Sequence, residues 1–466
     1  MSKPQRRRIE AKQTMSLPSK NHSRDDRRII LGAYYLVPNS HYTEVWRHPY
    51  SETDFAGKGI YQRLARFLES SGFDLAFIPE SLAAPRGDDG SLARGLEAGE
   101  LGTIRPDPTI LAQAITDVTR TLAVGVTLST TFWEPYHIAR LFGSLNHFSG
   151  GRVAWNIITS GGDDNARSFG SPQLPEHDSR YDRADHVVEA ASQLWQSWQP
   201  DALVADKESG VFADPRRVTE VHYDAGGVAL SGTLTLPRAP GGGRPVFIQA
   251  GESERGRDFA ARWAEFVFSI QNTAENLKSL RDDVRLRAGR LGRGPDAIRL
   301  LAAIIPVIGE TDEIAQARSR YLTDRIEPLR AARRLARNLG IAVPENLDVP
   351  LVAVAGDLEA LPKRIRRVAQ EVPEAKATFR YVATQIARSS STAWVVGSPR
   401  TVADQLQEFC DSESVDGFII TPTHFPGSFE EFGRSVVPIL RDRGLIREPE
   451  TGSVDFRSRL GLGPVR

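Results

Sequence analysis

From Ile29 onward, short runs of apolar and β-branched residues alternate with amphipathic stretches of helical length. Eight of the apolar runs have the length and composition of buried strands. We predict these strands at residues 29–37, 73–80, 122–130, 152–160, 245–251, 266–271, 298–309 and 415–422. The amphipathic stretches predict helices at 59–72, 109–120, 135–149, 180–198, 254–264, 274–292 and 429–444.

This alternation predicts an α/β protein with a parallel sheet, because each parallel pair of strands needs a connection of helical length. Eight strands favour a closed (β/α)8 barrel, the TIM barrel, over an open doubly wound sheet. No Gly-x-Gly-x-x-Gly follows the first strand, which disfavours a dinucleotide-binding fold. Such a barrel needs only about 250 residues. The surplus predicts one insertion after strand four (about 199–244, with a small hairpin) and a mostly helical one between strands seven and eight (about 310–398).

We expect residues 1–28, which are polar and basic, to form a disordered tail, and residues 29–466 to form a single barrel domain. The tail lacks the apolar run of a secretory signal. The sequence also has no stretch of about 18 apolar residues, so no membrane span is predicted. Lysine plus arginine equals aspartate plus glutamate, 59 against 59, which gives no support to nucleic-acid or membrane-surface binding. The single cysteine, Cys410, can form no disulfide within the chain, so we expect a buried thiol and a reducing, cytoplasmic location.

The loops that follow the barrel strands are the place to search for function, because active sites of this fold lie at the carboxyl ends of the strands. Glu80 ends the second strand, Thr127 lies near the end of the third, and Asn156 lies in the fourth. A polar loop, "GGDDNARSFG" (161–170), follows the fourth strand. Gly251, Glu252 and Ser253 join the fifth strand to its helix.

Ser253 stands where a phosphate could bind. Glycine permits close backbone approach, serine supplies a hydroxyl, and a helix N-terminus presents unpaired N–H groups to an anion. Ser253 is equally suited to be only the N-cap of the helix. Tyr181, after Arg180 near the start of the long helix that follows strand four, is a second candidate donor, although a tyrosine in a first helical turn can also serve packing.

Familiar catalytic and metal-binding motifs are missing from the sequence: it has no Gly-x-Ser-x-Gly, His-Glu-x-x-His or P-loop, and no paired cysteines. The nine histidines fall singly, without metal-ligand spacing, so no metal site is predicted. Strand ends rich in hydroxyls and amides but poor in nucleophiles indicate that a bound cofactor supplies the chemistry.

The segment "SGGRVAWNIITS" (149–160) resembles a signature of the luciferase-like flavin-dependent monooxygenases. The similar branch contains nitrilotriacetate monooxygenase component A, dibenzothiophene sulfone monooxygenase and pristinamycin synthase. Further segments resemble that branch in the same order, from about Ile29 to the C-terminus and most weakly across 310–398: "WRHP" (46–49), "FDLAFIPE" (73–80), "LSTTFWEPYHIAR" (128–140), "PEHDSRYDRADHVVEAASQLWQSW" (175–198), "FIQAGESERGRDFAARWAEFVF" (247–268) and "DGFIITPTHFPGSFEEFGRSVVPILRDRG" (416–444).

The resemblance implies a barrel that binds FMN without a covalent bond. The FMN contacts of the family carry over onto Glu80, Thr127, His177, Tyr181, Glu252 and Ser253. The branch usually has aspartate at the position of Glu80 and serine at that of Glu252. Because a carboxylate repels a phosphate, we expect Glu252 to turn its side chain away and leave its backbone N–H as a donor, while Glu80 shifts the flavin or narrows the substrate space. The strand half of the signature is then barrel wall, with Trp155 as packing, and the loop 161–170 walls the flavin pocket.

The resemblance further implies a two-component monooxygenase. FMN reduced by a separate NAD(P)H-dependent flavin reductase would react with O2 to a flavin hydroperoxide, which oxidises a small organic substrate such as a xenobiotic or an N- or S-containing compound. Tyr42 stands where the branch often has a second histidine, which leaves His41 and His48 as candidates for proton transfer. Homodimers or homotetramers are usual for the branch. Two alternatives stay open: an oxidoreductase of the same superfamily that uses flavin or deazaflavin, and a flavin-binding protein without turnover.

Overall fold

Eight parallel strands close into a barrel in the computed structural model, which describes residues 28–87, 89–448, 452, 454–463 and 465. Strand β1 pairs with both β2 and β13, and β10 pairs with β11, so the sheet has no open edge around the ring. The predicted TIM barrel is therefore confirmed. Its strands are β1 (Ile30–Tyr34), β2 (Leu75–Ile78), β3 (Ala123–Ser129), β4 (Val153–Ile158), β9 (Val246–Gln249), β10 (Phe266–Ser269), β11 (Arg299–Ile308) and β13 (Gly417–Ile420).

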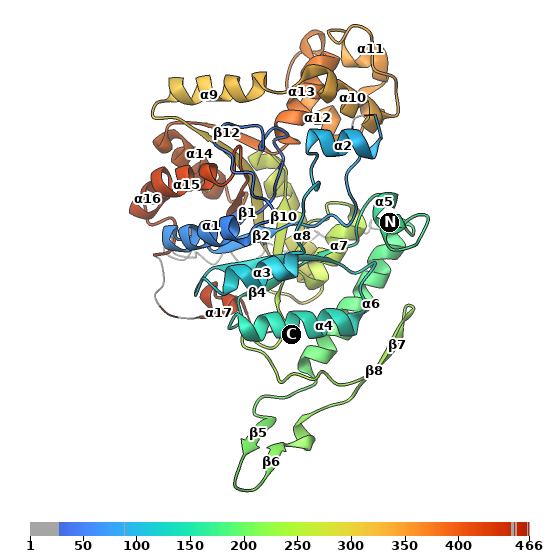
Figure 1. The fold of residues 1–466 in the computed structure, drawn as a ribbon, viewed down its shortest axis with the longest axis vertical. Helices are drawn as coiled ribbons and strands as arrows, with labels where there is room; N and C mark the ends of the chain where they lie inside the picture. Colours follow the sequence, from blue (N-terminus) through green and yellow to red (C-terminus); the bar gives the residue numbers. More distant parts are fainter. Residues whose placement is uncertain (1–27, 88, 449–451, 453, 464, 466) are drawn as a thin grey trace, which may run out of the picture.

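Helices connect these strands and surround the ring (Figure 1). The first one ends as the sequence predicts, because Gly72 adopts the left-handed conformation (φ 91°) that stops a helix. Pro135 opens α4 in its first turn, where its missing N–H costs nothing. The surrounding helices are α1 (Lys58–Ser71), α3 (Pro108–Thr116), α4 (Pro135–Phe148), α6 (His177–Gln196), α7 (Glu254–Trp263), α8 (Ala274–Arg290), α14 (Pro399–Asp411), α15 (Gly427–Ser435) and α16 (Val437–Asp442).

The insertion after β4 forms two hairpins, where the sequence analysis expected one. The first pairs β5 (Leu203–Asp206) with β6 (Val211–Ala213) and precedes a short helix, η2 (Pro215–Arg217). The second pairs β7 (Val221–Ala225) with β8 (Val228–Gly232) across a Gly-Gly turn. Both hairpins extend from the lower end of the molecule in Figure 1.

The insertion between β11 and β13 is mostly helical, as predicted, and lies at the opposite end of the molecule (Figure 1). It also contributes a ninth strand, β12, which pairs with β11 outside the ring and which the sequence analysis missed. Its elements are α9 (Asp312–Asp324), α10 (Pro328–Leu339), α11 (Leu351–Ala355), η3 (Leu358–Ala360), α12 (Lys363–Gln370), η4 (Glu374–Lys376), α13 (Phe379–Ser389) and β12 (Ala393–Gly397).

Several local predictions need correction. The long helix α6 begins at His177 rather than at Arg180, because Glu176 caps it by accepting from two backbone N–H groups. The final helix is divided into α15 and α16, with Pro438 in the first turn of the second. Short helices lie in loops that were expected to be irregular: α2 (Leu92–Ala98) and α5 (Asp163–Ser168). Cys410 is half-buried rather than fully buried, and its surroundings raise the pKa of the thiol to about 12.

The two faces of the barrel wall bury different side chains. Trp155 on β4 points outward, where its ring lies 5.5 Å from that of Phe142 and 6.3 Å from that of Trp195. Its indole N–H donates to the carbonyl oxygen of Leu128, and the side chain is fully buried. Trp155 is thus packing between wall and helices, as the sequence analysis expected.

The amino-terminal end of the barrel is covered by a short helix from the end of the chain, α17 (Phe456–Arg459). Phe456 is fully buried in the barrel interior, with its ring 5.9 Å from that of Phe266. Arg457 forms a buried ion pair with Glu265 at 3.0 Å, and Arg459 forms one with Asp74 at 3.1 Å. The described residues therefore close this end, and the carboxyl ends of the strands are where this fold places its ligands.

Candidate active site

Three stacked aromatic rings form a floor inside the barrel, just below its carboxyl end. Tyr34, Phe77 and Phe268 come from β1, β2 and β10, and their ring centroids lie 5.2–5.9 Å apart. Their planes are within 14° of parallel. Burial raises the pKa of Tyr34 to about 12, so its hydroxyl stays protonated at neutral pH. The floor gives a planar apolar ligand a surface on which to lie.

Buried polar atoms near the carboxyl ends of the strands lack partners within the described chain. Asn156 donates from Nδ2 to the hydroxyl of Thr127 at 2.9 Å, but its Oδ1 accepts no hydrogen bond. Oε1 of Gln249 and the hydroxyl of Thr421 are likewise buried without a partner among the described residues. Because unpaired buried acceptors are costly, this part of the barrel is built for a ligand with hydrogen-bond donors.

Two hydroxyl groups converge where β9 meets α7. Ser253 is the N-cap of α7, and its Oγ accepts from the backbone N–H of Gly256 at 3.0 Å. The hydroxyl oxygen of Tyr181, from α6, accepts from Nε2 of Gln249 at 3.3 Å, and the same hydroxyl is hydrogen-bonded to the hydroxyl of Thr159. Each oxygen accepts from an N–H of the protein, and a hydroxyl that accepts one hydrogen bond can still donate its own proton to an anion.

Glycine is required beside these hydroxyls. A Cβ on Gly251 would lie 2.3 Å from the hydroxyl oxygen of Tyr181, far inside contact distance. A Cβ on Gly256 would lie 3.0 Å from Oγ of Ser253 and 3.1 Å from the same tyrosine oxygen. The backbone here thus approaches as closely as an anion site at a helix N-terminus demands. Ser253 is both N-cap and candidate anion donor, so the two interpretations of the sequence are compatible.

Glu80 stands across the mouth, in a cluster of buried charges that the sequence did not reveal. Burial and the neighbouring Asp107 raise its pKa to about 7, while the guanidinium of Arg105 opposes the rise. Oε2 of Glu80 and Nε of Arg105 are both buried without a hydrogen-bond partner in the described residues. Arg105 comes from the segment between α2 and α3, and only the fold brings it here. Near neutral pH the carboxyl group can therefore hold or release a proton.

The side chain of Glu252 turns away from the anion site. Its carboxylate accepts from the hydroxyl of Ser269 at 2.7 Å and from Nε2 of Gln271, both at the end of β10. This is the orientation that the sequence analysis expected from phosphate repulsion. A carboxylate held by the next strand leaves the start of α7 free of negative side-chain charge on that side.

His177 and the polar segment 161–170 lie at the outer rim of the site. His177 is exposed at the start of α6, with Nδ1 2.6 Å from the carboxylate of Asp178 and its ring 5.2 Å from that of Tyr181. The segment 161–170 contains α5, whose Asn165 accepts from the backbone N–H of Leu82 at 3.1 Å. It thus joins the loop after β2 along one side of the mouth.

The two candidate histidines are not brought together. His41 is buried: its Nδ1 lies 2.8 Å from the hydroxyl of Thr392, and its ring packs 5.0 Å from that of Tyr34 in the floor. Burial lowers the pKa of His41 to about 4, so the ring is neutral at physiological pH. His48 instead stacks on His424 at 4.4 Å, and burial lowers the pKa of both rings. Of the two, His41 is the one that touches the floor of the site.

Other kinds of site are not found in the described part of the chain. No group of three or more histidine, cysteine, aspartate or glutamate side chains among the described residues could hold a metal ion. A search of the same residues finds no helix with the length and apolar character needed to cross a membrane. Fold and site together define a barrel enzyme whose aromatic floor suits a flat cofactor and whose hydroxyls at the start of α7 suit an anion.

Comparison with known proteins identifies the family to which this chain belongs. Residues 46–414 match the family described as luciferase-like monooxygenase. Dibenzothiophene-sulfone monooxygenase of Rhodococcus erythropolis is 37% identical over 444 residues, which are 94% of this chain and 97% of that protein. Nitrilotriacetate monooxygenase component A of Aminobacter aminovorans is 30% identical over 444 residues, with the same coverage of 94% and 97%.

Solved structures of similar proteins have the same fold as this chain. DmoA from Hyphomicrobium sulfonivorans superposes with a TM-score of 0.83 at 30% identity, over 94% of this chain and 92% of that one. A riboflavin lyase, crystallised with modified FMN and its substrate riboflavin, superposes with a TM-score of 0.78 at 30% identity, over 93% and 96%. The chain belongs to the luciferase-like monooxygenase family and is a flavin-dependent monooxygenase, which confirms the resemblance noted in the sequence.

Proposed function

We propose that this chain is the oxygenase component of a two-component system and receives reduced FMN from a separate NAD(P)H-dependent flavin reductase. The observation that carries the proposal is the pair of hydroxyls, Tyr181 and Ser253, that converge on the glycine-lined start of α7. A relative that covers nearly the whole chain is named as component A of a monooxygenase, and the riboflavin lyase was solved with a modified FMN.

FMN fits the residues that are present. Its phosphate would accept from the hydroxyls of Ser253 and Tyr181, with His177 at the exposed side. The flavin ring and ribityl chain can donate hydrogen bonds, which the unpartnered oxygens of Asn156 and Gln249 lack. When bound in its reduced form, FMN supplies the electrons that activate O2.

The protein's own residues then position the cofactor and control water and protons. The aromatic floor and the fully closed amino-terminal end exclude water from below. Glu80 can hold a proton at its buried Oε2 near neutral pH, in reach of the mouth. His41, being neutral, would orient a hydrogen bond rather than carry charge. Thr127 fixes the carboxamide of Asn156.

The decisive experiment removes the two hydroxyls without changing the shape of the site. The double variant Ser253→Ala with Tyr181→Phe loses two hydrogen bonds to a charged group, each contributing about 1.5–3 kcal/mol. We expect the affinity for FMN, measured by quenching of flavin fluorescence, to fall at least about a hundredfold. The matched control, Ser209→Ala with Tyr136→Phe, changes the same residue types at exposed positions and should leave the affinity unchanged. Equal affinity of the two double variants would refute the proposed phosphate site.

Function is tested with reduced FMN supplied by a flavin reductase. We expect O2 consumption coupled to oxidation of an N- or S-containing organic compound, and both should require this protein. Tighter binding of a deazaflavin than of FMN would favour the oxidoreductase alternative. FMN binding without oxygenation across a broad panel of organosulfur compounds, amines and xenobiotics would favour a flavin-binding protein without turnover.

We further propose a homodimer or homotetramer in a reducing, cytoplasmic location. The β5–β6 hairpin extends from the body of the barrel and exposes Val204 and Phe212, the latter to 70%. Exposed apolar side chains on a projecting hairpin are suited to packing against another copy. Light scattering after gel filtration measures the mass directly. A monomeric mass at micromolar concentration would contradict this proposal.

A further inference from the structure

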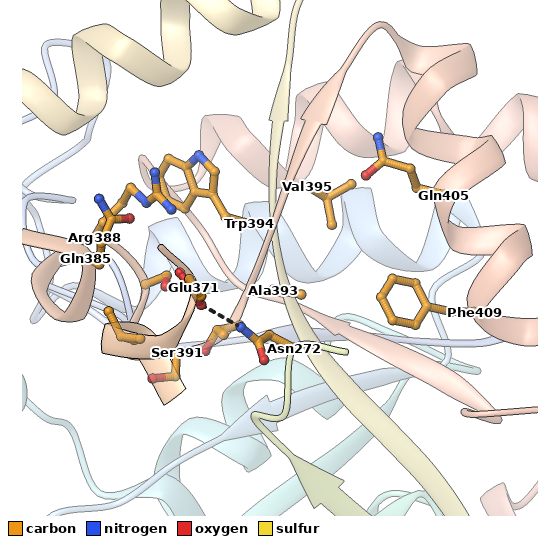
Figure 2. Close-up of a pocket in the computed structure, with 13 residues that line it drawn as sticks. Asn272, Glu371, Gln385, Arg388, Ser391, Ala393, Trp394, Val395, Gln405 and Phe409 are labelled. Atoms are coloured by element: carbon orange, nitrogen blue, oxygen red, sulfur yellow. Dashed lines mark hydrogen bonds between the residues drawn. The ribbon is translucent and has the colours of Figure 1, made fainter. Parts of the chain in front are cut away.

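A cavity of about 270 Å³ opens beside the barrel mouth, between the end of β10 and the start of β12 (Figure 2). Along β11, strand β10 pairs with residues 299–302 and β12 pairs with residues 304–308, on the edge opposite to β13. The pairing of β10 with β11 therefore ends just before the pairing of β12 with β11 begins. The gap between Asn272 and Ala393 becomes the cavity, and α13, α14 and the segment after α12 complete its walls.

Two oppositely charged side chains face the cavity. Glu371 accepts from Nδ2 of Asn272 at 3.4 Å, the contact drawn in Figure 2. Arg388 lies over the ring of Trp394, with its guanidinium carbon 5.2 Å from the ring centroid. Within the described residues, no ion pair of 4.0 Å or less joins Glu371 to Arg388. Burial raises the pKa of Glu371, and the charge of Arg388 opposes the rise, so the two groups are neighbours without contact.

The same wall holds hydrogen-bonding groups that the protein does not use. Nε of Arg388 and the hydroxyl of Ser391 are buried and have no hydrogen-bond partner in the described chain. Ser390 and Ser391 also both adopt positive φ angles, 51° and 68°, which non-glycine residues rarely do. Ser390 is the C-cap of α13, which accounts for its φ, so the unpaired buried donors are the feature here that is typical of a binding position.

A third charged residue near the cavity, Arg367, already has partners within the protein. Arg367 donates to Oδ1 of Asn272 at 3.3 Å. Burial lowers the pKa of Arg367, and the carboxylate of Glu252 is the largest of the charges that oppose this. Arg367 also acts on Glu371, so Arg388, whose Nε has no hydrogen-bond partner among the described residues, is the cation left to a ligand, with Glu371 as the carboxylate opposite it. Glu371 is exposed on its outer side and Arg388 is half-buried, so both charges can be reached by a ligand from solvent.

We propose that this cavity binds a small zwitterionic molecule of the amino-acid type. Its carboxylate would accept from Nε of Arg388 and the hydroxyl of Ser391, and its ammonium group would donate to Glu371. An apolar side chain would lie against Val395 and Phe409, which line the far side in Figure 2. None of the predicted FMN contacts lines the cavity, so the proposal does not depend on the flavin site.

The cavity nevertheless lies close to the barrel mouth. Thr392, one of its lining residues, is the hydrogen-bond partner of His41, which packs on Tyr34 of the aromatic floor. A bound molecule would thus be one layer of side chains from the space above the floor.

Isothermal titration of the whole chain with three related probes tests the proposal without any variant. L-methionine carries both charges, N-acetyl-L-methionine lacks the cation, and L-methioninamide lacks the carboxylate. We expect methionine to bind at least about tenfold more tightly than either of the others, because each analogue loses one of the two charge-assisted hydrogen bonds. Equal binding of the three probes, or no binding of methionine at about 10 mM, would overturn it.

Variants then assign the binding to this cavity. Glu371→Gln and Arg388→Gln should each weaken methionine binding at least about tenfold. The matched controls Glu374→Gln and Arg400→Gln change exposed residues of the same types nearby and should keep wild-type affinity. FMN affinity should stay unchanged in all four, which also shows that the variants are folded. Methionine binding that survives both cavity substitutions would place the ligand elsewhere and refute the assignment.

Discussion

Replacing Glu80 with glutamine should change how the stability of the protein depends on pH. The pKa of Glu80 is about 7 in the folded chain, against an ordinary value of 4.5, because the carboxyl group is buried beside Asp107. Between these two pH values the folded chain keeps a proton that the unfolded chain has released. The free energy of unfolding therefore decreases as pH rises through this window, and glutamine, which does not ionise, abolishes the decrease.

The size of the effect follows from the pKa difference. A change of 2.5 units, from 4.5 to about 7, corresponds to about 3 kcal/mol at 1.36 kcal/mol per unit. For a chain of 466 residues, the entropy of unfolding is about 1 kcal/mol per kelvin, so the melting temperature should differ by about 3 °C. The Glu80→Gln variant should gain this margin over wild type between about pH 4.5 and 8.5.

Scanning calorimetry of the flavin-free protein across this pH range measures the difference. Glu345→Gln is the matched control, since Glu345 lies outside the barrel mouth in the helical insertion, and its curve should run parallel to that of wild type. Parallel curves for Glu80→Gln and wild type would refute the reasoning, because they would mean that Glu80 ionises alike in the folded and unfolded chains.

Two further substitutions probe the barrel. Gly251→Ala places a methyl group 2.3 Å from the hydroxyl oxygen of Tyr181; it should weaken FMN binding at least about tenfold, and unchanged fluorescence titration would contradict the close approach. Glu265→Gln leaves Arg244 and Arg457 without their buried carboxylate, and should cost about 3–5 kcal/mol in urea unfolding at pH 7. The two arginines outweigh the effect of burial and lower the pKa of Glu265 to about 2. The wild-type protein should therefore lose this stability margin as pH falls from 4.5 toward 2. A loss at higher pH would contradict the ion pairing.

The barrel could be predicted because its signal is repeated along the chain. Each buried parallel strand is a short apolar run, and each connection to the next strand needs a helix. With eight such repeats, an error in the boundary of one strand or helix does not change the predicted fold. Elements that the sequence missed have weak signals. The helix α5 has six residues, most of them polar. Strand β12, "AWVVG", lies deep in a helical insertion, and its pairing with β11 depends on contacts 89 residues apart, such as Ile304 with Ala393.

Some residues of the candidate site could likewise be predicted from the sequence, and others could not. Ser253 could be found because N-cap and strand end are adjacent in sequence, whereas Glu80 and Arg105 are joined only by the fold. In a continuously apolar strand, sequence alone does not say which side chains face inward, so the stacking of Tyr34 on Phe268 could not be foreseen. The two charges of the lateral cavity, Glu371 and Arg388, likewise meet through the tertiary structure of the insertion.

The helix α17 has a consequence for how the molecule is made. Phe456 seals the end of the barrel opposite to the mouth, and Arg457 and Arg459 neutralise Glu265 and Asp74 beside it. Ribosomes deliver these residues after every strand of the ring, so a nascent chain that already holds the whole ring still lacks Phe456, Arg457 and Arg459 at this end of the barrel. Stop codons only a few residues before Phe456 should therefore be as damaging as stops much further upstream, because both leave this end of the barrel open to chaperones and proteases.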